Sequence, residues 1–248
     1  MIGSIFRFLL LLNIKFVARA FYHFEVQWPS NKHISYKDQR IFLLLNHTSL
    51  FEPIFIGAFP IRLLWQIARR FTYPIAEKTL RRPIAGKAFR ILSPTTLPLT
   101  RNRDKNWDVF LDTVKNSDCF IGFAPEGRMR RANGLDSDGR PMTMKGGVVD
   151  ILENIPEGNI LFLYSGGLHH VQTPGEGAPR IFKRIHLGIE SVPVTEYLDG
   201  IRQKKPENFR KAVIADLESR RDNLCPHVID MRRGFIVRFV QQLIFMWT

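Results

Sequence analysis

The stretch IFLLLNHTSLFEP at residues 41–53 combines a fold signal with a group of reactive side chains. Its first five residues form a short continuous apolar run, which is typical of a strand buried on both faces of a sheet. The run stops at a polar segment that contains His47, and Ser49 is a suitable residue to begin a helix. We therefore expect a strand, then a turn that carries His47, then a helix over about residues 50–59.

The same alternation continues along the chain. Further strands are expected at residues 96–100, 119–123, 160–164 and 181–189, and helices at residues 107–115, 146–152 and 208–220. A polar, glycine-rich loop is expected at residues 128–140. Strands that alternate with helices predict an α/β fold, in which a mostly parallel central sheet is flanked by helices.

Both ends of the chain have the pattern of amphipathic helices. Residues 1–24 carry three basic residues and no acidic one, and their longest apolar run, residues 8–12, is too short to span a bilayer. This pattern favours a helix in the membrane interface, with a helix packed on the domain or a cleaved signal peptide as alternatives. The predicted organisation is a membrane-interacting segment at 1–30, a central domain at 31–222 and an amphipathic helix at 223–248.

The charge balance narrows the classes of partner. Lys and Arg number 36 against 23 Asp and Glu, which gives a net charge of +13. Such a balance favours anionic partners, and basic residues beside aromatic ones at both ends suit an anionic membrane surface better than nucleic acid. The chain has no nucleotide or dinucleotide fingerprint and no serine-hydrolase elbow. His169 and His170 are adjacent but have no metal-ligand spacing, so no metal is expected.

His47 and Glu52 are the strongest catalytic candidates. An imidazole can remove the proton of a hydroxyl near neutral pH, and a carboxylate on its other ring nitrogen fixes the tautomer. Positions five apart lie about 140° apart on a helix, so the two side chains meet only if His47 precedes the helix and Glu52 lies in its first turn. The alternative is that Ser49 and Glu52 form a capping box, in which Glu52 only satisfies backbone amides.

Two further segments place charged residues after predicted strands. LPLTR at residues 97–101 ends in Arg101, and arginine can bind a phosphate through two hydrogen bonds. APEGRM at residues 124–129 predicts a tight turn that carries Glu126. Ligands of open α/β sheets bind beyond the carboxyl ends of strands, so both segments and His47 can share one site. The alternative for each segment alone is an ordinary surface turn.

Taken in order, these segments resemble the glycerophospholipid acyltransferase family, which includes lysophosphatidate and glycerol-phosphate acyltransferases. Residues 46–52 resemble its N-H-x-S-x-x-D block with Glu52 in place of Asp, and residues 97–101 resemble its arginine-containing second block. Residues 124–129 resemble F-P-E-G-T-R, with Met129 in the place of the final arginine. The resemblance covers about residues 38–222.

The resemblance implies an acyl-thioester donor (acyl-CoA or acyl carrier protein), a lysophospholipid or glycerol-phosphate acceptor, and no cofactor. It also implies peripheral or monotopic attachment to the cytoplasmic face of the inner membrane. His47 would be the base and Glu52 its partner. The residues implied to bind the acceptor are Arg101, Glu126, Gly127 and Arg128.

Three alternatives stay open at this point. The first is another lysolipid acceptor, such as a lyso-aminolipid. The second is a membrane-binding protein of the same fold without catalysis, which the departures at Glu52 and Met129 suggest. The third, a nucleic-acid binder, rests on the net charge alone.

Overall fold

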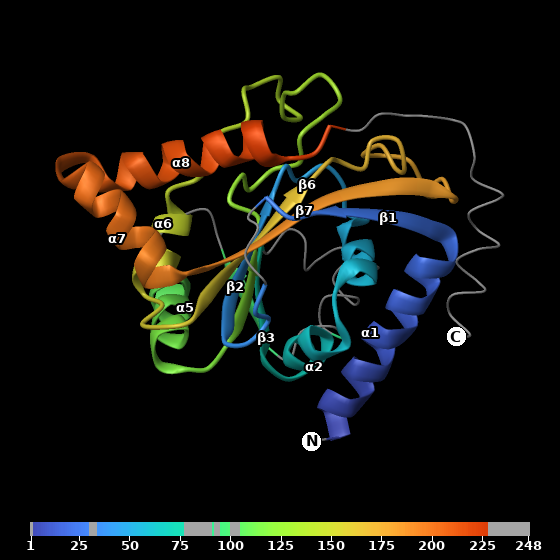
Figure 1. The fold of residues 1–248 in the computed structure, drawn as a ribbon, viewed down its shortest axis with the longest axis horizontal. Coiled ribbons are helices and arrows are strands. Elements are labelled where there is room, and N and C mark those ends of the chain that lie inside the picture. Colours follow the sequence, from blue (N-terminus) through green and yellow to red (C-terminus); the bar gives the residue numbers. More distant parts are fainter. Residues whose placement is uncertain (1, 30–33, 77–90, 92–94, 100–104, 228–248) are drawn as a thin grey trace.

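A computed structural model describes residues 2–29, 34–76, 91, 95–99 and 105–227 of the protein. The strands in this part are β1 (Tyr22–Gln27), β2 (Gln39–Leu45), β3 (Phe71–Ala76), β4 (Thr95–Leu99), β5 (Phe120–Phe123), β6 (Asn159–Ser165) and β7 (Lys183–Pro193). They form one seven-stranded sheet in the order β1-β7-β6-β2-β5-β3-β4. Every neighbouring pair is parallel except β6 and β7. The predicted mostly parallel α/β fold is therefore confirmed (Figure 1).

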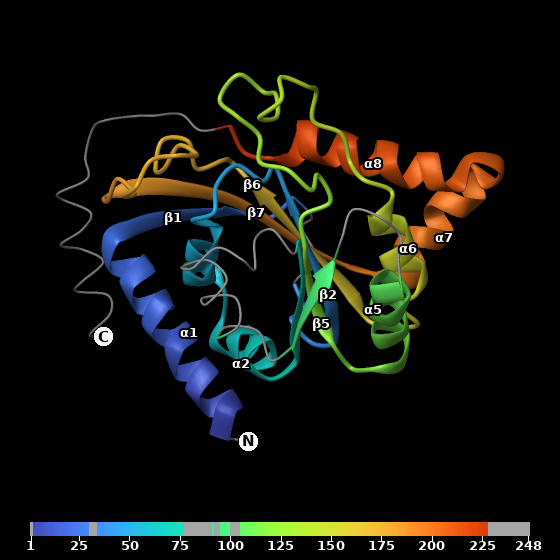
Figure 2. The same ribbon diagram turned by 180° about the vertical axis from the view of Figure 1, so that it is seen from behind.

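Helices cover both faces of this sheet (Figures 1 and 2). The described helices are α1 (Ile2–Phe21), the 3-10 helix η1 (Glu52–Ala58), α2 (Ile61–Arg70), α5 (Lys105–Asn116), α6 (Gly147–Glu153), α7 (Val194–Lys204), the 3-10 turn η2 (Pro206–Asn208) and α8 (Phe209–Leu224). One hydrophobic core joins the sheet to α1, η1 and α2, and a second joins it to α5, α6, α7 and α8. The flanking helices that the sequence predicted are thus present on both faces.

The central strand β2 explains the apolar run from which the fold was predicted. It lies between β6 and β5, so both of its edges are paired. Leu43 and Leu45 are fully buried in the core on the α8 side, and Leu44 is buried in the core on the α1 side. A strand that is covered on both faces needs apolar residues at successive positions, not at alternate ones.

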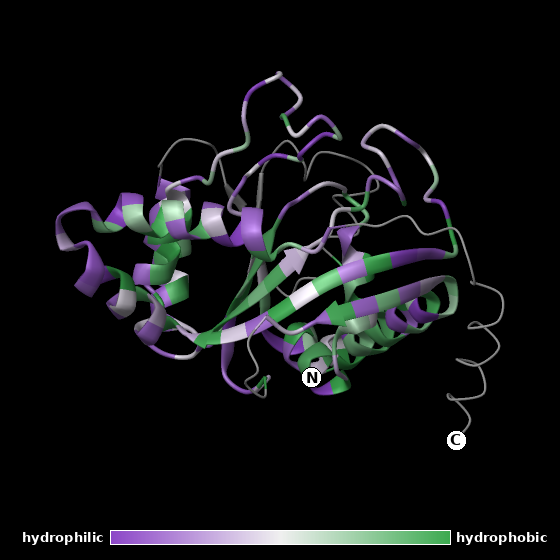
Figure 3. Ribbon diagram, turned by 45° about the horizontal axis from the view of Figure 1, so that its top comes forward, coloured by the Kyte–Doolittle hydropathy of each residue, from purple (hydrophilic) through white to green (hydrophobic). Residues whose placement is uncertain are grey.

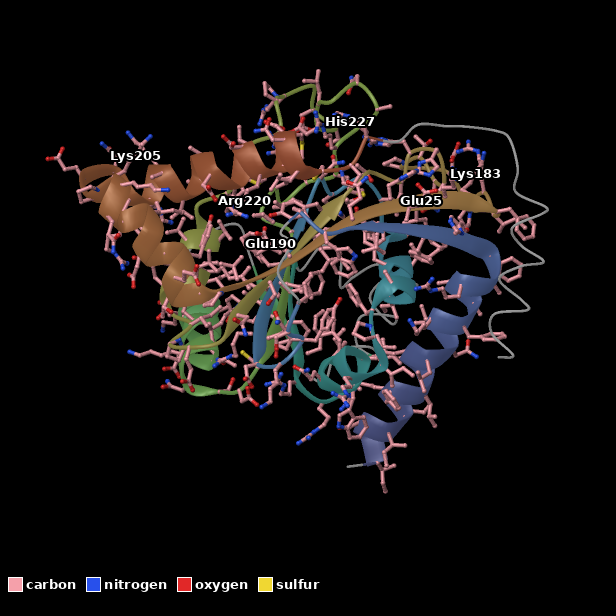
Figure 4. All side chains as sticks on the ribbon, viewed as in Figure 1. Glu25, Lys183, Glu190, Lys205, Arg220 and His227 are labelled. Carbon is pink, nitrogen blue, oxygen red and sulfur yellow. The ribbon has the colours of Figure 1, made fainter. Side chains whose placement is uncertain are left out.

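Helix α8 is joined to the sheet by a partly buried polar cluster. The guanidinium of Arg220 donates hydrogen bonds to the hydroxyl of Tyr164 at 2.9 Å and to the carboxylate of Glu190 at 2.8 Å. It also lies over the ring of Phe162, 4.7 Å from the ring centroid. Figure 4 shows Arg220 on α8 facing Glu190 on β7. Because α8 is held here, the next residue along it, Arg221, has a defined position above the sheet.

The three cations of helix α1 are bound within the protein. The sequence predicted a helix in the membrane interface, with a helix packed on the domain as an alternative, and Arg7, Lys15 and Arg19 all donate hydrogen bonds to backbone carbonyls of η1, its end or α2. Much of α1 is hydrophobic (Figure 3). Its exposed large apolar side chains are Ile2, Ile5, Phe6, Leu9, Phe16, Val17 and Phe21. Among the described residues, no helix has both the length and the apolar character to cross a bilayer.

Some elements differ from the sequence-based expectation. The helix expected at residues 50–59 is the shorter 3-10 helix η1, because residues 48–51 form a turn around the Glu52 side chain. Strand β1 was not expected, and it lies within the predicted segment 1–30 although it pairs with β7 in the central sheet. The amphipathic helix predicted at 223–248 lies almost wholly outside the described residues. The predicted domain boundaries stay a prediction.

Candidate active site

The chain turns sharply at the carboxyl end of β2. Asn46 follows the strand with φ of 65°, a left-handed conformation that asparagine adopts more readily than most residues. Its side-chain amide donates a hydrogen bond to the carbonyl of Ser165 at 2.8 Å, at the end of the neighbouring strand β6. The turn therefore places His47 at the carboxyl edge of the sheet, where ligands of α/β proteins bind.

His47 and Glu52 are in direct contact. The Nδ1 atom of His47 forms a hydrogen bond with Oε2 of Glu52, and the two side chains are 17% and 8% exposed. The other oxygen of Glu52 accepts hydrogen bonds from the backbone N–H groups of Thr48 at 2.7 Å and Ser49 at 3.2 Å. Glu52 therefore has both roles that the sequence left open, since one oxygen binds the ring and the other binds backbone amides.

The surroundings of His47 raise its pKa above the ordinary value. Burial alone would lower the pKa, but the carboxylate of Glu52, and to a smaller extent that of Glu126, outweigh this effect by stabilising the imidazolium. Because Glu52 binds Nδ1, the Nε2 atom is left to exchange a proton with a substrate. The ring is thus oriented as a general base would be.

Glu126 holds the same turn through hydrogen bonds to its backbone. It is 1% exposed, and its carboxylate accepts hydrogen bonds from the backbone N–H groups of Asn46 at 3.2 Å and His47 at 2.9 Å. Burial raises the pKa of Glu126, although these backbone donors and Arg221 oppose the change. Arg221 of α8 lies 3.8 Å from the carboxylate. The resemblance implied that Glu126 binds the acceptor, whereas the structure shows it bound to the backbone that carries His47.

Gly127 and Arg128 continue the turn after β5. Gly127 has φ of +64°, which favours glycine, and its N–H donates to the carbonyl of Ala124 at 3.0 Å. The tight turn predicted here is therefore confirmed. Arg128 forms an ion pair with the buried carboxylate of Asp136 and a second one with Asp138 at 3.3 Å. The side chain implied to bind an acceptor is thus already paired with the loop that follows it.

Asp136 organises that loop. One of its oxygens accepts hydrogen bonds from the backbone N–H groups of Asp138 at 2.8 Å and Arg140 at 2.9 Å. The N–H of Arg140 is the largest influence, and despite the opposing effect of burial, it and Arg128 lower the pKa of Asp136 to about 2. Asp136 is therefore ionised at any pH at which the protein is expected to work.

A cavity of about 140 Å³ opens beside this loop. Its walls carry charges of both signs, from Glu126, Arg128, Asp136, Arg140 and Lys145, together with Pro141, Met142 and Thr143. Neither His47 nor Glu52 lines it. Glu126 is the link, because it lines the cavity and also binds the backbone N–H of His47. The cavity therefore adjoins the turn on which the histidine lies.

The loop after β6 forms another side of the site, which sequence reasoning missed. The N–H of Leu168 donates to the hydroxyl of Thr48 at 2.8 Å, and the hydroxyl of Ser49 donates to Gln172 at 3.0 Å. His169 lies 2.8 Å from the carbonyl of Arg130, whose own N–H donates to the carbonyl of His47 at 2.7 Å. The one feature of the sequence that could have indicated this loop is the Gly-Gly pair at residues 166–167, directly after the buried strand.

Two other predictions from the sequence concern a metal site and the role of Arg101. In the part of the chain that the structure describes, no three His, Cys, Asp or Glu side chains are placed to hold a metal ion. Arg101, which the resemblance implied to bind the acceptor, lies outside the described residues. The structure thus brings together His47, Glu52 and Glu126, with Gly127 and Arg128 beside them.

The chain is thus an α/β protein with a histidine–carboxylate pair in the turn at the carboxyl end of its central strand. Among solved structures, the chain is similar to the crystal structure of the 1-acyl-sn-glycerophosphate (LPA) acyltransferase PlsC from Thermotoga maritima. The likeness has a TM-score of 0.50 and an identity of 18%, and it covers 86% of this chain and 80% of that one. At this identity the likeness shows that the two share a fold. No family model matches the chain, and no curated protein is significantly similar in sequence.

Proposed function

We propose that the protein is an O-acyltransferase, which moves a fatty acyl group from acyl-CoA or an acyl carrier protein to the hydroxyl of a lysophospholipid or glycerol phosphate. The observation that carries this proposal is the contact between Glu52 and Nδ1 of His47 at the carboxyl edge of the sheet. The fold shared with PlsC supports the same class of reaction.

In this proposal His47 acts as the general base. Its Nε2 takes the proton of the acceptor hydroxyl while the oxygen attacks the carbonyl carbon of the thioester. The Glu52 carboxylate stabilises the imidazolium that forms. When the tetrahedral intermediate collapses, the C–S bond breaks and the leaving thiolate takes the proton from His47. An ester and a free thiol result, and no covalent acyl-enzyme is needed.

The charged cavity is the proposed site for the acceptor headgroup. Arg128 is neutralised by Asp136, but Arg140 and Lys145 also line the cavity and form no ion pair with another described residue. Two such cations suit an anionic phosphate. A lyso-aminolipid is the alternative acceptor.

Membrane attachment through α1 is part of the proposal. The exposed apolar side chains of α1 are joined at its end by Ile181 and Phe182, and the rings of Phe21 and Phe182 lie 5.8 Å apart. An apolar strip of this kind inserts into the boundary between headgroups and acyl chains. Because the cations of α1 bind backbone carbonyls, the expected preference for anionic lipid must come from the rest of a chain with net charge +13. We place the protein at the cytoplasmic face of the inner membrane, as a peripheral or monotopic protein.

A donor and acceptor panel tests the proposal. Acyl-CoA and acyl carrier protein donors are combined with lysophosphatidate, glycerol phosphate and a lyso-aminolipid, while thiol release and ester products are measured. We expect His47→Ala to lower the rate by about 10²- to 10⁴-fold. The control is His23→Ala, since His23 lies on β1 and its ring lies 3.9 Å from the carboxylate of Glu25 on the same strand. Wild-type protein that binds vesicles but releases no thiol with any pair would identify it as a membrane-binding protein without catalysis.

A further inference from the structure

Two cations of α1 bind the same end of the helix that begins with Glu52. Lys15 donates hydrogen bonds from Nζ to the carbonyls of Gly57 at 3.0 Å and Phe59 at 2.7 Å. Arg19 donates from Nε to the same Gly57 carbonyl at 2.8 Å. The last carbonyls of a helix have no partner within it, so cations that bind them fix the helix end.

The packing at Gly57 is so close that a larger residue would force a neighbour to move. A Cβ added there would lie 2.5 Å from the ring of Phe24 and 3.0 Å from the Cβ of Ala18. The backbone of η1 therefore rests directly on α1 and on the start of β1. Together with the hydrogen bonds of Lys15 and Arg19, this contact fixes η1 to α1.

The two members of the catalytic pair depend on different supports. The backbone of His47 is held by Glu126, which follows β5 and lies beside Arg221 of α8. Glu52 is the first residue of η1, whose opposite end is held by α1. Gly57 follows Glu52 by five positions in η1, a path of about 10 Å at the rise of about 2 Å per residue of a 3-10 helix, so we expect a shift at Gly57 to reach Glu52.

We propose that Lys15 and Arg19 are positioning residues for the His47–Glu52 pair. They tie the end of η1 to α1, and thereby set how closely the Glu52 carboxylate approaches Nδ1 of His47. The catalytic consequence rests on the proposed acyltransferase function, whereas the geometric consequence does not. The helix with the exposed apolar face thus also takes part in the site.

Arg7 provides a matched control on the same helix. It donates from Nε to the carbonyl of Ala68 at 2.8 Å, near the end of α2, with the geometry that Arg19 has at Gly57. Helix α2 carries neither His47 nor Glu52. Arg19→Met and Arg7→Met remove the same charge and the same kind of hydrogen bond, but only Arg19→Met loosens η1.

The experiment compares full-length wild type, Arg7→Met, Arg19→Met, the double variant Lys15→Met/Arg19→Met and the conservative pair Lys15→Arg/Arg19→Lys. The first readout is the pKa of His47 from an NMR titration of the imidazole, which needs no activity. The charged groups that act on this ring are Glu52 of η1 and Glu126 after β5. If Glu52 moves away, the pKa of His47 falls, whereas general destabilisation leaves the pKa of the folded molecules unchanged.

The second readout is the pH profile of kcat/KM for thiol release. We expect Arg19→Met and the double variant to move the acidic limb to lower pH, and the double variant to lower the plateau by about 10²-fold, the loss that a misplacement of about 1 Å can cause. Arg7→Met should keep the wild-type limb, and the conservative pair should restore most of it. Binding to vesicles is measured in parallel and should be alike in Arg7→Met and Arg19→Met.

Each outcome decides the proposal. An unchanged His47 pKa in the double variant, or an equal change in Arg7→Met, overturns it. If the double variant does not fold, the comparison of Arg19→Met with Arg7→Met decides the question in the same way. If wild type transfers no acyl group but the His47 pKa falls in Arg19→Met alone, the positioning role stands and the acyltransferase function fails.

Discussion

The backbone N–H of His47 donates a hydrogen bond to the buried carboxylate of Glu126 at 2.9 Å. A side chain from the segment after β5 thus fixes the residue proposed as base, although the two lie far apart in sequence. The second oxygen of Glu126 holds Asn46 in its left-handed turn. The conformation of the turn therefore depends on a carboxylate that follows a different strand.

Replacing that carboxylate should therefore reduce activity per folded molecule. Glu126→Gln keeps one oxygen but turns an amide donor towards a backbone donor, and an unsatisfied buried group costs about 1–3 kcal/mol. The control is Asp216→Asn, because Asp216 accepts hydrogen bonds from the hydroxyl of Tyr197 at 2.8 Å and from Nε of Arg220 at 2.8 Å, and it does not line the cavity. Urea unfolding should show a loss in both variants, and the assay a loss of kcat in Glu126→Gln alone. Equal kcat values in the two would remove Glu126 from the site.

The acid side of the pH profile should report the pair of His47 and Glu52. His47 must be neutral to act as base, and its pKa is raised, so the acidic limb of kcat/KM should lie above the ordinary histidine value of about 6.5. Glu52→Gln removes the charge that stabilises the imidazolium, so the limb should move to lower pH while the plateau falls. A limb that stays in place after this substitution would assign it to another group.

Glu52→Asp tests why this chain has the longer carboxylate. One oxygen of Glu52 binds the amides of Thr48 and Ser49 while the other binds His47. A side chain shorter by one methylene cannot make both sets of contacts, because η1 is held at its far end. We expect a loss of about 10²-fold in kcat/KM, the scale of a 1 Å displacement. Wild-type activity in Glu52→Asp would mean that η1 can shift freely.

Asp136→Asn should weaken the protein in a manner that depends on pH. The pKa of Asp136 is lowered to about 2 from an ordinary 3.8, so the stability that its charge adds is complete above about pH 4 and is lost as the pH falls towards 2. The difference in unfolding free energy between wild type and variant should be largest near pH 7 and should shrink below pH 3. Urea titrations at several pH values measure it, and a constant difference would contradict the assignment.

Gly57→Ala should show whether the free-energy cost of overpacking exceeds the gain in helix propensity that alanine brings. The added methyl would meet Phe24 and Ala18, and overpacking of this kind costs about 1–3 kcal/mol. Gly200→Ala is the control, because a Cβ at Gly200 of α7 meets nothing within 4 Å. That control should instead stabilise the protein by about 0.4–1 kcal/mol. Thermal unfolding of the two variants in opposite directions is the expected result.

Local patterns in the sequence were enough to predict much of the sheet. The buried strand at residues 41–45 and the turn after it are defined by neighbouring residues, so both were found, together with the pairing of His47 with Glu52. Strand β1 was missed because its six residues follow a long apolar helix and pair only with a distant strand. Contacts were thus predicted correctly from the sequence mainly where the two partners are close in the chain.

Contacts between distant segments could not be read in this way. Arg221 reaches Glu126 because α8 packs on the sheet through its apolar residues and Arg220, and no spacing in the sequence marks this. The partners of the α1 cations could not be predicted either, since a sequence does not show that helix ends nearby offer unpaired carbonyls. The pairing of Arg128 with Asp136 depends likewise on the path of one loop.

The position of β1 at the edge of the sheet has a consequence for biosynthesis. Its partner is β7, whose paired residues 183–188 leave the ribosome long after residues 22–27. At translation rates of about 5–20 residues per second, the interval is on the order of 10–30 s. For that time β1 has no strand to pair with, although η1 and α2, on which α1 packs, are already synthesised. Under the proposed membrane attachment, α1 would meet the bilayer before the sheet is complete, and the last strands would fold onto an N-terminal segment already in place.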